Sequence, residues 1–152
     1  MAKFRLATLL KLRERDRDMA ANAVQEVRNA IEKLNEMKRS IDQSNEQMDD
    51  FRKNASRGAV DLQQILDAQR YQMVLSSQLT QIADRQGQLS QEMERRQIAL
   101  VKSQQSVKAL EKLRDQREDA ATVHALAKQQ ERLDEWSSIR HAMNGTHDEK
   151  ND

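Results

Sequence analysis

The first third of the chain carries one continuous series of residues at alternating intervals of four and three, most of them apolar. The series is Leu6, Leu10, Arg13, Arg17, Ala20, Val24, Val27, Ile31, Leu34, Lys38, Ile41, Asn45 and Met48. This spacing lines one side of an α-helix and is typical of a coiled-coil seam rather than of a globular helix. The chain has no Pro and only three Gly among 152 residues, so little interrupts a helix. We therefore expect a helix over about 3–53.

Residues 54–60 contain the only concentrated turn signal in the body of the chain, Asn54-Ala55-Ser56-Arg57-Gly58. Asp61 follows and is suited to cap a second helix, expected over about 61–142. That helix carries its own seam: Ile65, Ala68, Gln72, Leu75, Leu79, Ile82, Gln86, Leu89, Met93, Arg96, Leu100, Ser103, Val107 and Leu110. Gly87 lies within it and costs about 1 kcal/mol relative to Ala, too little to end a long helix.

The two seams predict a register for an antiparallel hairpin, in which the numbers of facing residues add to a constant. A constant of 113 brings together apolar pairs such as Val24 with Leu89 and centres the turn between Ser56 and Arg57. It also places Arg17 opposite Arg96, a like-charged layer expected to be weak or to hold an anion. A shift by one heptad keeps the periodicity but moves the turn off centre, so 113 is preferred.

The predicted fold is thus all-α: an antiparallel two-helix coiled-coil hairpin whose second helix is longer and overhangs the first. The hairpin domain would cover 1–143 and a disordered tail 144–152, after the helix-stop signal Asn144-Gly145. The overhang still carries apolar residues, namely Leu113, Ala120, Ala121, Val123, Leu126, Ala127, Leu133, Trp136 and Ile139. An apolar stripe of this kind is normally covered, either by self-association or a folded-back end, or by the surface of a partner.

The composition argues against enzymatic chemistry. Charged residues make up 34% of the chain and aromatic residues 3%, which excludes a thick globular core; a net charge of only +1 and the periodic seams disfavour disorder. A two-stranded coil offers no pocket in which catalytic groups converge. The chain has no Cys, and His124, His141 and His147 lack the spacing of metal ligands. We expect no catalytic residues, no cofactor and no metal.

Basic residues collect at the end of the hairpin opposite the turn. They are Lys3, Arg5, Lys11, Arg13, Arg15 and Arg17 from the first helix and Arg95, Arg96, Lys102, Lys108, Lys112, Arg114 and Arg117 from the second. Such an end fits an acidic protein surface, an anionic lipid or a nucleic acid. Nucleic acid is the weaker interpretation because no aromatic stacking residues are interleaved.

Two sequence blocks resemble a known family. The first is Phe4-Arg5-Leu6-Ala7-Thr8-Leu9-Leu10-Lys11-Leu12-Arg13-Glu14; the second is Lys108-Ala109-Leu110-Glu111-Lys112-Leu113-Arg114, followed by Gln130-Glu131 and Asp134-Glu135 before Arg140. They resemble the signature of the FliJ family, the soluble coiled-coil component of the bacterial flagellar type III export apparatus. One departure is Ala120-Ala121-Thr122, where the family often has an aromatic residue, which puts contacts that depend on that ring in doubt.

The resemblance implies a non-enzymatic stalk that inserts into the ring of the flagellar export ATPase. It further implies contacts with the export-gate membrane protein and with chaperones of export substrates, at the cytoplasmic face of the cell membrane, and help in coupling ATP hydrolysis and proton motive force to secretion. The candidate partner-binding residues are Phe4, Leu6, Leu10, Arg13, Leu110, Leu113, Arg114 and Arg117. The leucines are expected to seal the hairpin end, and the three arginines to contact partners. We expect no nucleic acid, and a monomer or weak self-association. Alternatives are an injectisome stalk protein, a self-associating structural coiled coil and a nucleic-acid-binding coiled coil.

Overall fold

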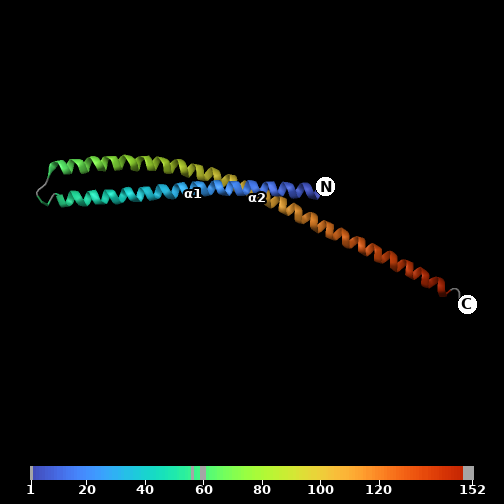
Figure 1. Cartoon of the computed structure of the whole chain (residues 1–152). Helices are drawn as coiled ribbons and strands as arrows, with labels where there is room; N and C mark the ends of the chain where they lie inside the picture. The colour runs from blue at the N-terminus through green and yellow to red at the C-terminus, as the bar shows by residue number, and fades with distance from the viewer. Residues whose placement is uncertain (1, 56, 59–60, 149–152) are drawn as a thin grey trace. The chain divides into compact units, whose positions relative to one another are not determined.

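The computed structural model describes residues 2–55, 57–58 and 61–148, with the side chains of 2 and 146–148 excepted. In this part of the chain the only regular elements are two helices that pack against each other, α1 (Ala2–Ala55, 54 residues) and α2 (Leu62–Asp148, 87 residues). The two helices are visible in Figure 1. The predicted fold class is confirmed: the protein is all-helical, with two packed helices of which the second is longer.

The connection between the helices follows the predicted turn chemistry. The backbone N–H of Arg57 donates to the carbonyl oxygen of Asn54 at 3.2 Å, which closes a turn directly after α1. Asp61 caps α2, because its Oδ1 accepts a hydrogen bond from the N–H of Gln63 at 3.0 Å. Arg52 and Lys53 occupy the last turn of α1, where positive charge is favoured by the helix dipole.

The far end of α2 differs from the prediction. The helix was expected to end at about 142, before Asn144-Gly145, yet it continues through both residues to Asp148. That expected end was wrong, because a single Gly costs a helix only about 1 kcal/mol and no Pro follows it. The rest of the predicted tail, 149–152, lies outside the described residues.

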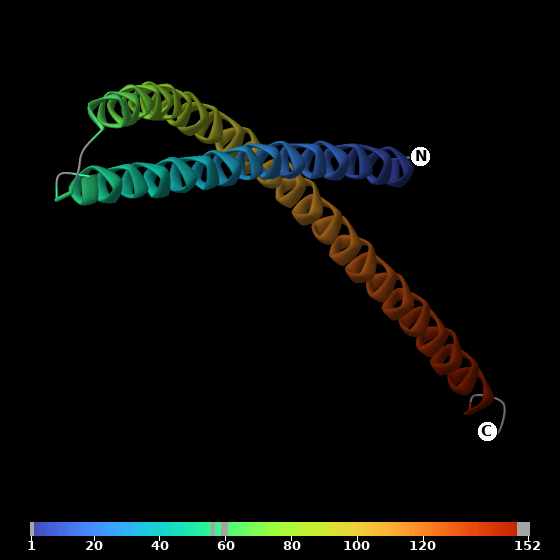
Figure 2. The same cartoon turned by 60° about the vertical axis from the view of Figure 1, so that its left-hand side comes forward.

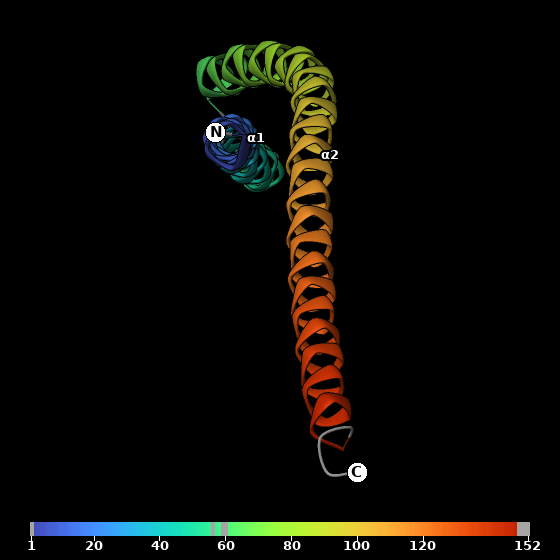
Figure 3. The ribbon, with the colours of Figure 1, turned by 90° about the vertical axis from the view of Figure 1, so that its right-hand side faces the viewer.

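The chain divides into two compact units. We call residues 12–105 the shaft unit, and residues 1–11 with 106–152 the end unit. In the shaft unit α1 and α2 lie side by side in opposite directions (Figure 2). Figure 3 shows the green-to-yellow part of α2 arching around α1, as the wrapping of two helices along a heptad seam requires.

The buried residues lie at the predicted seam positions of both helices. They are Leu6, Leu10, Val24, Val27, Ala68, Leu75, Ile82, Leu89 and Val107. Along α2 every predicted seam position from Ile65 to Leu110 is buried or half-buried, whereas on α1 the two exceptions are Arg13 and Lys38, which are exposed. The pattern of apolar spacing therefore identified the helix faces that pack.

The register of the shaft unit, however, differs from the prediction. Gln72 Nε2 donates to Asp49 Oδ1 at 2.8 Å, and Gln86 Nε2 donates to Asn35 Oδ1 at 3.0 Å. Nη1 of Arg96 donates to the carbonyl oxygen of a residue on α1, Ala23, at 2.7 Å. The residue numbers of these pairs add to between 119 and 121. Facing seam residues are thus those that add to 120, so the predicted constant of 113 was wrong by one heptad.

Hydrogen bonding of polar seam residues explains the difference. In the register of 113, Gln72 and Gln86 would face the apolar Ile41 and Val27, and Arg96 would face Arg17. Polar residues within a coiled-coil seam are known to specify register. In the observed register all three α2 residues find polar partners on α1, and the predicted like-charged layer does not form: Arg17 pairs instead with Asp18 at 3.3 Å.

Candidate partner-binding surface

The end unit contains a small apolar contact between the two helices. Leu6 and Leu10 of α1 and Val107 of α2 are buried, and Leu110 is half-buried. Leu6 and Leu10 are four residues apart, so their side chains lie on the same face of α1. These four residues hold residues 2–11 against α2.

Beside this contact lies a cavity of about 280 Å³, which we call the end cavity. Its lining residues are Lys3, Leu6, Arg114, Arg117, Glu118 and Ala121. Its wall is mostly apolar, because it is formed by Leu6, Ala121 and the aliphatic parts of the longer side chains; three of its residues are cationic and one is anionic. An apolar hollow ringed mainly by positive charge fits a partner segment that combines an apolar side chain with acidic neighbours.

Arg114 has an additional interaction. Its Nη2 lies 3.3 Å from Oδ1 of the adjacent Asp115, and the side chains are 46% and 62% exposed. An exposed pair of this kind contributes little to stability. The guanidinium group is therefore held only weakly and remains available to an acidic partner.

Two of the candidate residues in the end unit are exposed apolar side chains. Phe4 is 77% exposed, and Leu113 is 38% exposed. The carbonyl oxygen of Phe4 accepts a hydrogen bond from Thr8 Oγ1 at 2.9 Å, an interaction within α1 that leaves the ring in solvent. Aromatic and Arg side chains are enriched among the residues that dominate protein interfaces.

Arg13 is separate from the other candidates, because it belongs to the shaft unit. Its Nη1 lies 3.3 Å from Oδ2 of Asp16, and both side chains are about half exposed. The structure thus brings Leu6, Arg114 and Arg117 together around one cavity, places Leu10 and Leu110 in the apolar contact beside it, and leaves Phe4 and Leu113 exposed.

Sequence reasoning missed three of the residues that line the end cavity: Lys3, Glu118 and Ala121. Lys3 had been noted only as one of many basic residues. A register of 120 pairs Lys3 with Arg117 and Leu6 with Arg114, so a correct register would have indicated the cavity. The information needed to choose the register of 120 was present in the sequence, in the polar seam residues of the shaft.

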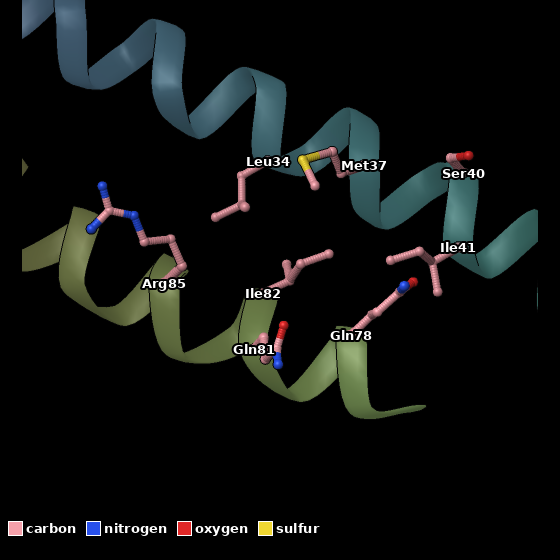
Figure 4. Close-up of a pocket in the computed structure, with 8 residues that line it drawn as sticks. All are labelled: Leu34, Met37, Ser40, Ile41, Gln78, Gln81, Ile82 and Arg85. Carbon is pink, nitrogen blue, oxygen red and sulfur yellow. The ribbon is translucent and has the colours of Figure 1, made fainter. Parts of the chain in front are cut away.

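The shaft unit offers a second surface, a groove of about 540 Å³ between the helices. Figure 4 shows Leu34, Met37 and Ile41 of α1 and Ile82 of α2 directed into the space between the ribbons. Gln78, Gln81, Arg85 and Ser40 complete its lining. Met37 is 56% exposed, so the groove presents apolar surface to solvent.

The described residues show neither a metal site nor a membrane-spanning helix. Within 2–55, 57–58 and 61–148 no three His, Asp or Glu side chains cluster in a way that suits a metal ion. In the same ranges, no helix combines the length and apolar character needed to cross a bilayer.

Comparison with known families identifies the chain. The family model described as the flagellar FliJ protein matches residues 1–146. The chain belongs to the FliJ family. It is therefore a coiled-coil component of the flagellar protein export apparatus, and FliJ proteins are structural components of that apparatus rather than enzymes. A search of curated proteins and a search of solved structures each found no match.

Family membership confirms the resemblance drawn from the two sequence blocks. It favours the flagellar system over the injectisome alternative, and it implies partners within the export apparatus. The assignment of particular residues to partner binding stays a prediction.

Proposed function

We propose that this FliJ protein binds the ring of the flagellar export ATPase through the end cavity and the exposed Phe4 beside it on α1. In this proposal it acts as a stalk and helps couple energy to the secretion of flagellar subunits. It works at the cytoplasmic face of the cell membrane, where it also contacts the export-gate membrane protein and the chaperones of export substrates.

The observation that carries the proposal is the meeting of the two family-like blocks in one cavity. Leu6 comes from the first block and Arg114 from the second, and the two lie more than a hundred positions apart in the sequence. The cationic lining supports an acidic partner surface, since charge complementarity across an interface raises association rates and excludes wrong partners.

Reversing charge at the end cavity tests the proposal. We expect the double substitution Arg114→Glu and Arg117→Glu to weaken binding to the purified export ATPase about tenfold or more, because two attractive contacts become repulsive. Binding is measured by interferometry at low and moderate salt, and the loss is expected to shrink as salt screens the charges. Circular dichroism checks that the variant keeps its helical content.

Lys128→Glu with Arg132→Glu is the matched control, because it makes the same change of charge at exposed positions farther along α2. This control is expected to bind the ATPase as the wild type does. Equal losses in the two variants would show that overall charge, not the end cavity, governs binding.

Motility tests the same residues in the cell. Reversing Arg13, Arg114 and Arg117 together is expected to reduce spreading in soft agar while the protein accumulates normally. Comparing Arg13→Glu alone with the Arg114 and Arg117 pair then separates the shaft unit from the end unit. Normal swimming of the triple variant would overturn the site assignment.

A further inference from the structure

The seams of the shaft unit fit two registers one heptad apart. A seam with a strict interval of seven looks the same to its partner after a slide of seven residues, so periodicity alone favours neither constant. What distinguishes the two registers is the identity of the side chains that face each other.

Apolar pairing within the shaft unit favours neither register. The register of 113 would pair Ala20 with Met93, Val24 with Leu89, Ile31 with Ile82, Leu34 with Leu79, and Met48 with Ile65. The observed register of 120 pairs Ala20 with Leu100, Val27 with Met93, Ile31 with Leu89, Ile41 with Leu79, and Ala55 with Ile65. Each register thus has five fully apolar layers.

Polar contacts favour the observed register. We call Gln72, Gln86 and Arg96 the polar rungs, because each hydrogen-bonds across from α2 to α1. Gln72 is held twice, since it also accepts a hydrogen bond from Arg52 Nη1 at 2.9 Å through its Oε1. Nη1 of Arg96 also lies 3.3 Å from Oε2 of Glu26.

The polar rungs are therefore what separates the two registers. Most of the rung contacts are made at exposed or half-exposed positions, where each hydrogen bond contributes only modestly. The register of 113 loses these bonds and places Arg96 opposite Arg17, but it keeps the same number of apolar layers. Contacts of modest size thus decide between the registers.

The connection between the helices only mildly hinders a slide of one helix along the other. Going from one register to the other moves the point at which the chain reverses by about half a heptad. The end of α1 at Ala55 and the start of α2 at Leu62 then each shift by about one helical turn. Terminal turns of helices are the parts that open most easily.

We propose that α1 and α2 exchange between registers of 120 and 113, and that the polar rungs hold the pair at 120. A slide of one heptad displaces one helix along the other by about 10 Å. In the end unit Leu6 would then face Val107 in place of Arg114, which takes the end cavity apart. The exchange is thus a built-in device that presents or removes the cationic cavity; only this consequence for partner binding rests on the proposed function.

Disulfide trapping reads the register directly, and the chain has no native Cys to interfere. With Met93→Cys as a common partner, Val27→Cys reports the register of 120 and Ala20→Cys reports 113. Each pair is equilibrated in a glutathione redox buffer, and the fraction of intramolecular disulfide is measured. Asn29→Cys, at an exposed position of α1 directed away from the seam, sets the background level.

Shifting the balance between the registers is the decisive step. Replacing Gln72 and Gln86 by Leu removes two rungs, and Arg17→Glu turns the repulsive layer of 113 into an attractive pair with Arg96. We expect this triple change to raise the disulfide yield of the Ala20 pair relative to the Val27 pair about tenfold or more, because Gln72 and Gln86 together lose three hydrogen bonds to α1. Arg28→Glu, with the same change of charge at an exposed position, should leave the ratio unchanged.

The proposal is overturned if the Ala20 pair stays at the Asn29 background in the wild type and in the triple variant. If circular dichroism shows that the triple variant has lost helicity, Arg17→Glu alone is used, since it keeps all three rungs. That single change must still raise the Ala20 pair above its level in Arg28→Glu. Because trapping needs no partner, failure of ATPase binding and failure of the register exchange give different results.

Discussion

Helix α2 contains two regions that differ in what covers their apolar residues. In the shaft unit, Leu75, Ile82 and Leu89 are each at most 6% exposed because α1 packs on them. Between 112 and 145, which we call the exposed segment, every described side chain is exposed. Helical backbone is continuous through both regions. Helix formation in this chain therefore does not depend on burial of a seam.

The apolar residues of the two regions also follow different paths around the helix. The positions that continue the α2 seam past Leu110 are Arg114, Arg117, Ala121 and His124, which are mostly polar. Val123 and Leu126 lie roughly 140–160° around the helix from Leu110, at about 100° per residue. The apolar residues beyond the end cavity therefore do not continue the seam that pairs with α1, and they lie on other faces of α2.

The largest expected difference between the two regions is in the loss of stability when one leucine in each is replaced by alanine. Leu75→Ala, at a position only 3% exposed, should lower the free energy of unfolding by about 2–4 kcal/mol, because it leaves a cavity between the helices. Leu133→Ala, at a position 63% exposed, should change it by about 0.5 kcal/mol or less. Urea denaturation followed by circular dichroism measures both, and equal losses would mean that the exposed segment is covered in solution.

How far the sequence predicted these regions depends on the kind of interaction involved. The burial of Leu75 and Val107 followed from apolar spacing, because the heptad fixes which face of a helix packs. The register did not follow from that spacing. It depends on which groups of the other helix are reached by the long polar side chains, such as those of Gln72 and Arg96. The extension of α2 past Gly145 was missed because Asn144-Gly145 was interpreted as a helix stop. A turn signal ends α1 near Asn54, where the chain reverses, but a similar signal does not end α2 where no reversal follows.

The candidate site was predicted in the same partial way. Arg114 and Arg117 were found through the family-like block, and Leu6 through both the block and the seam. Lys3 and Glu118 were missed because the predicted register places Lys3 opposite Leu110 and not opposite Arg117. An error of one heptad in the shaft thus became an error in the composition of the site.

Substituting the glycines of α2 gives a smaller contrast between the same two regions. Apart from the neighbouring residues and the backbone of α2 itself, no atom lies within 4 Å of the position that a Cβ would occupy at Gly87 or Gly145. Gly87→Ala should stabilise the shaft by about 0.5–1 kcal/mol, since Ala loses less backbone entropy in a helix. Gly145→Ala should raise helical content near the end of α2 without moving the urea midpoint. A shift of the midpoint by Gly145→Ala would show that the end of α2 unfolds together with the shaft.

The smallest expected effect concerns pH and the ion pairs of Arg96. The pKa of Glu92 is lowered from its ordinary value of 4.5, chiefly by the hydrogen bond that Arg96 Nε donates to its Oε1 at 2.8 Å. A carboxyl group whose pKa is lower in the folded state stabilises that state above its ordinary pKa, and the contribution is lost as pH falls through the lowered value. Glu92→Gln should therefore melt at a slightly lower temperature than the wild type at pH 7, and the difference should shrink as pH falls below 4.5 and vanish below the lowered pKa of Glu92.

Glu131→Gln makes the same substitution in the exposed segment and is the control for that experiment. Its melting temperature should equal that of the wild type across the whole range, because unfolding of the shaft does not involve residue 131. Adding salt at pH 7 should also narrow the gap between Glu92→Gln and the wild type, since exposed ion pairs are screened. A gap that survives in acid would mean that Glu92 supports the shaft through packing of its side chain and not through its charge.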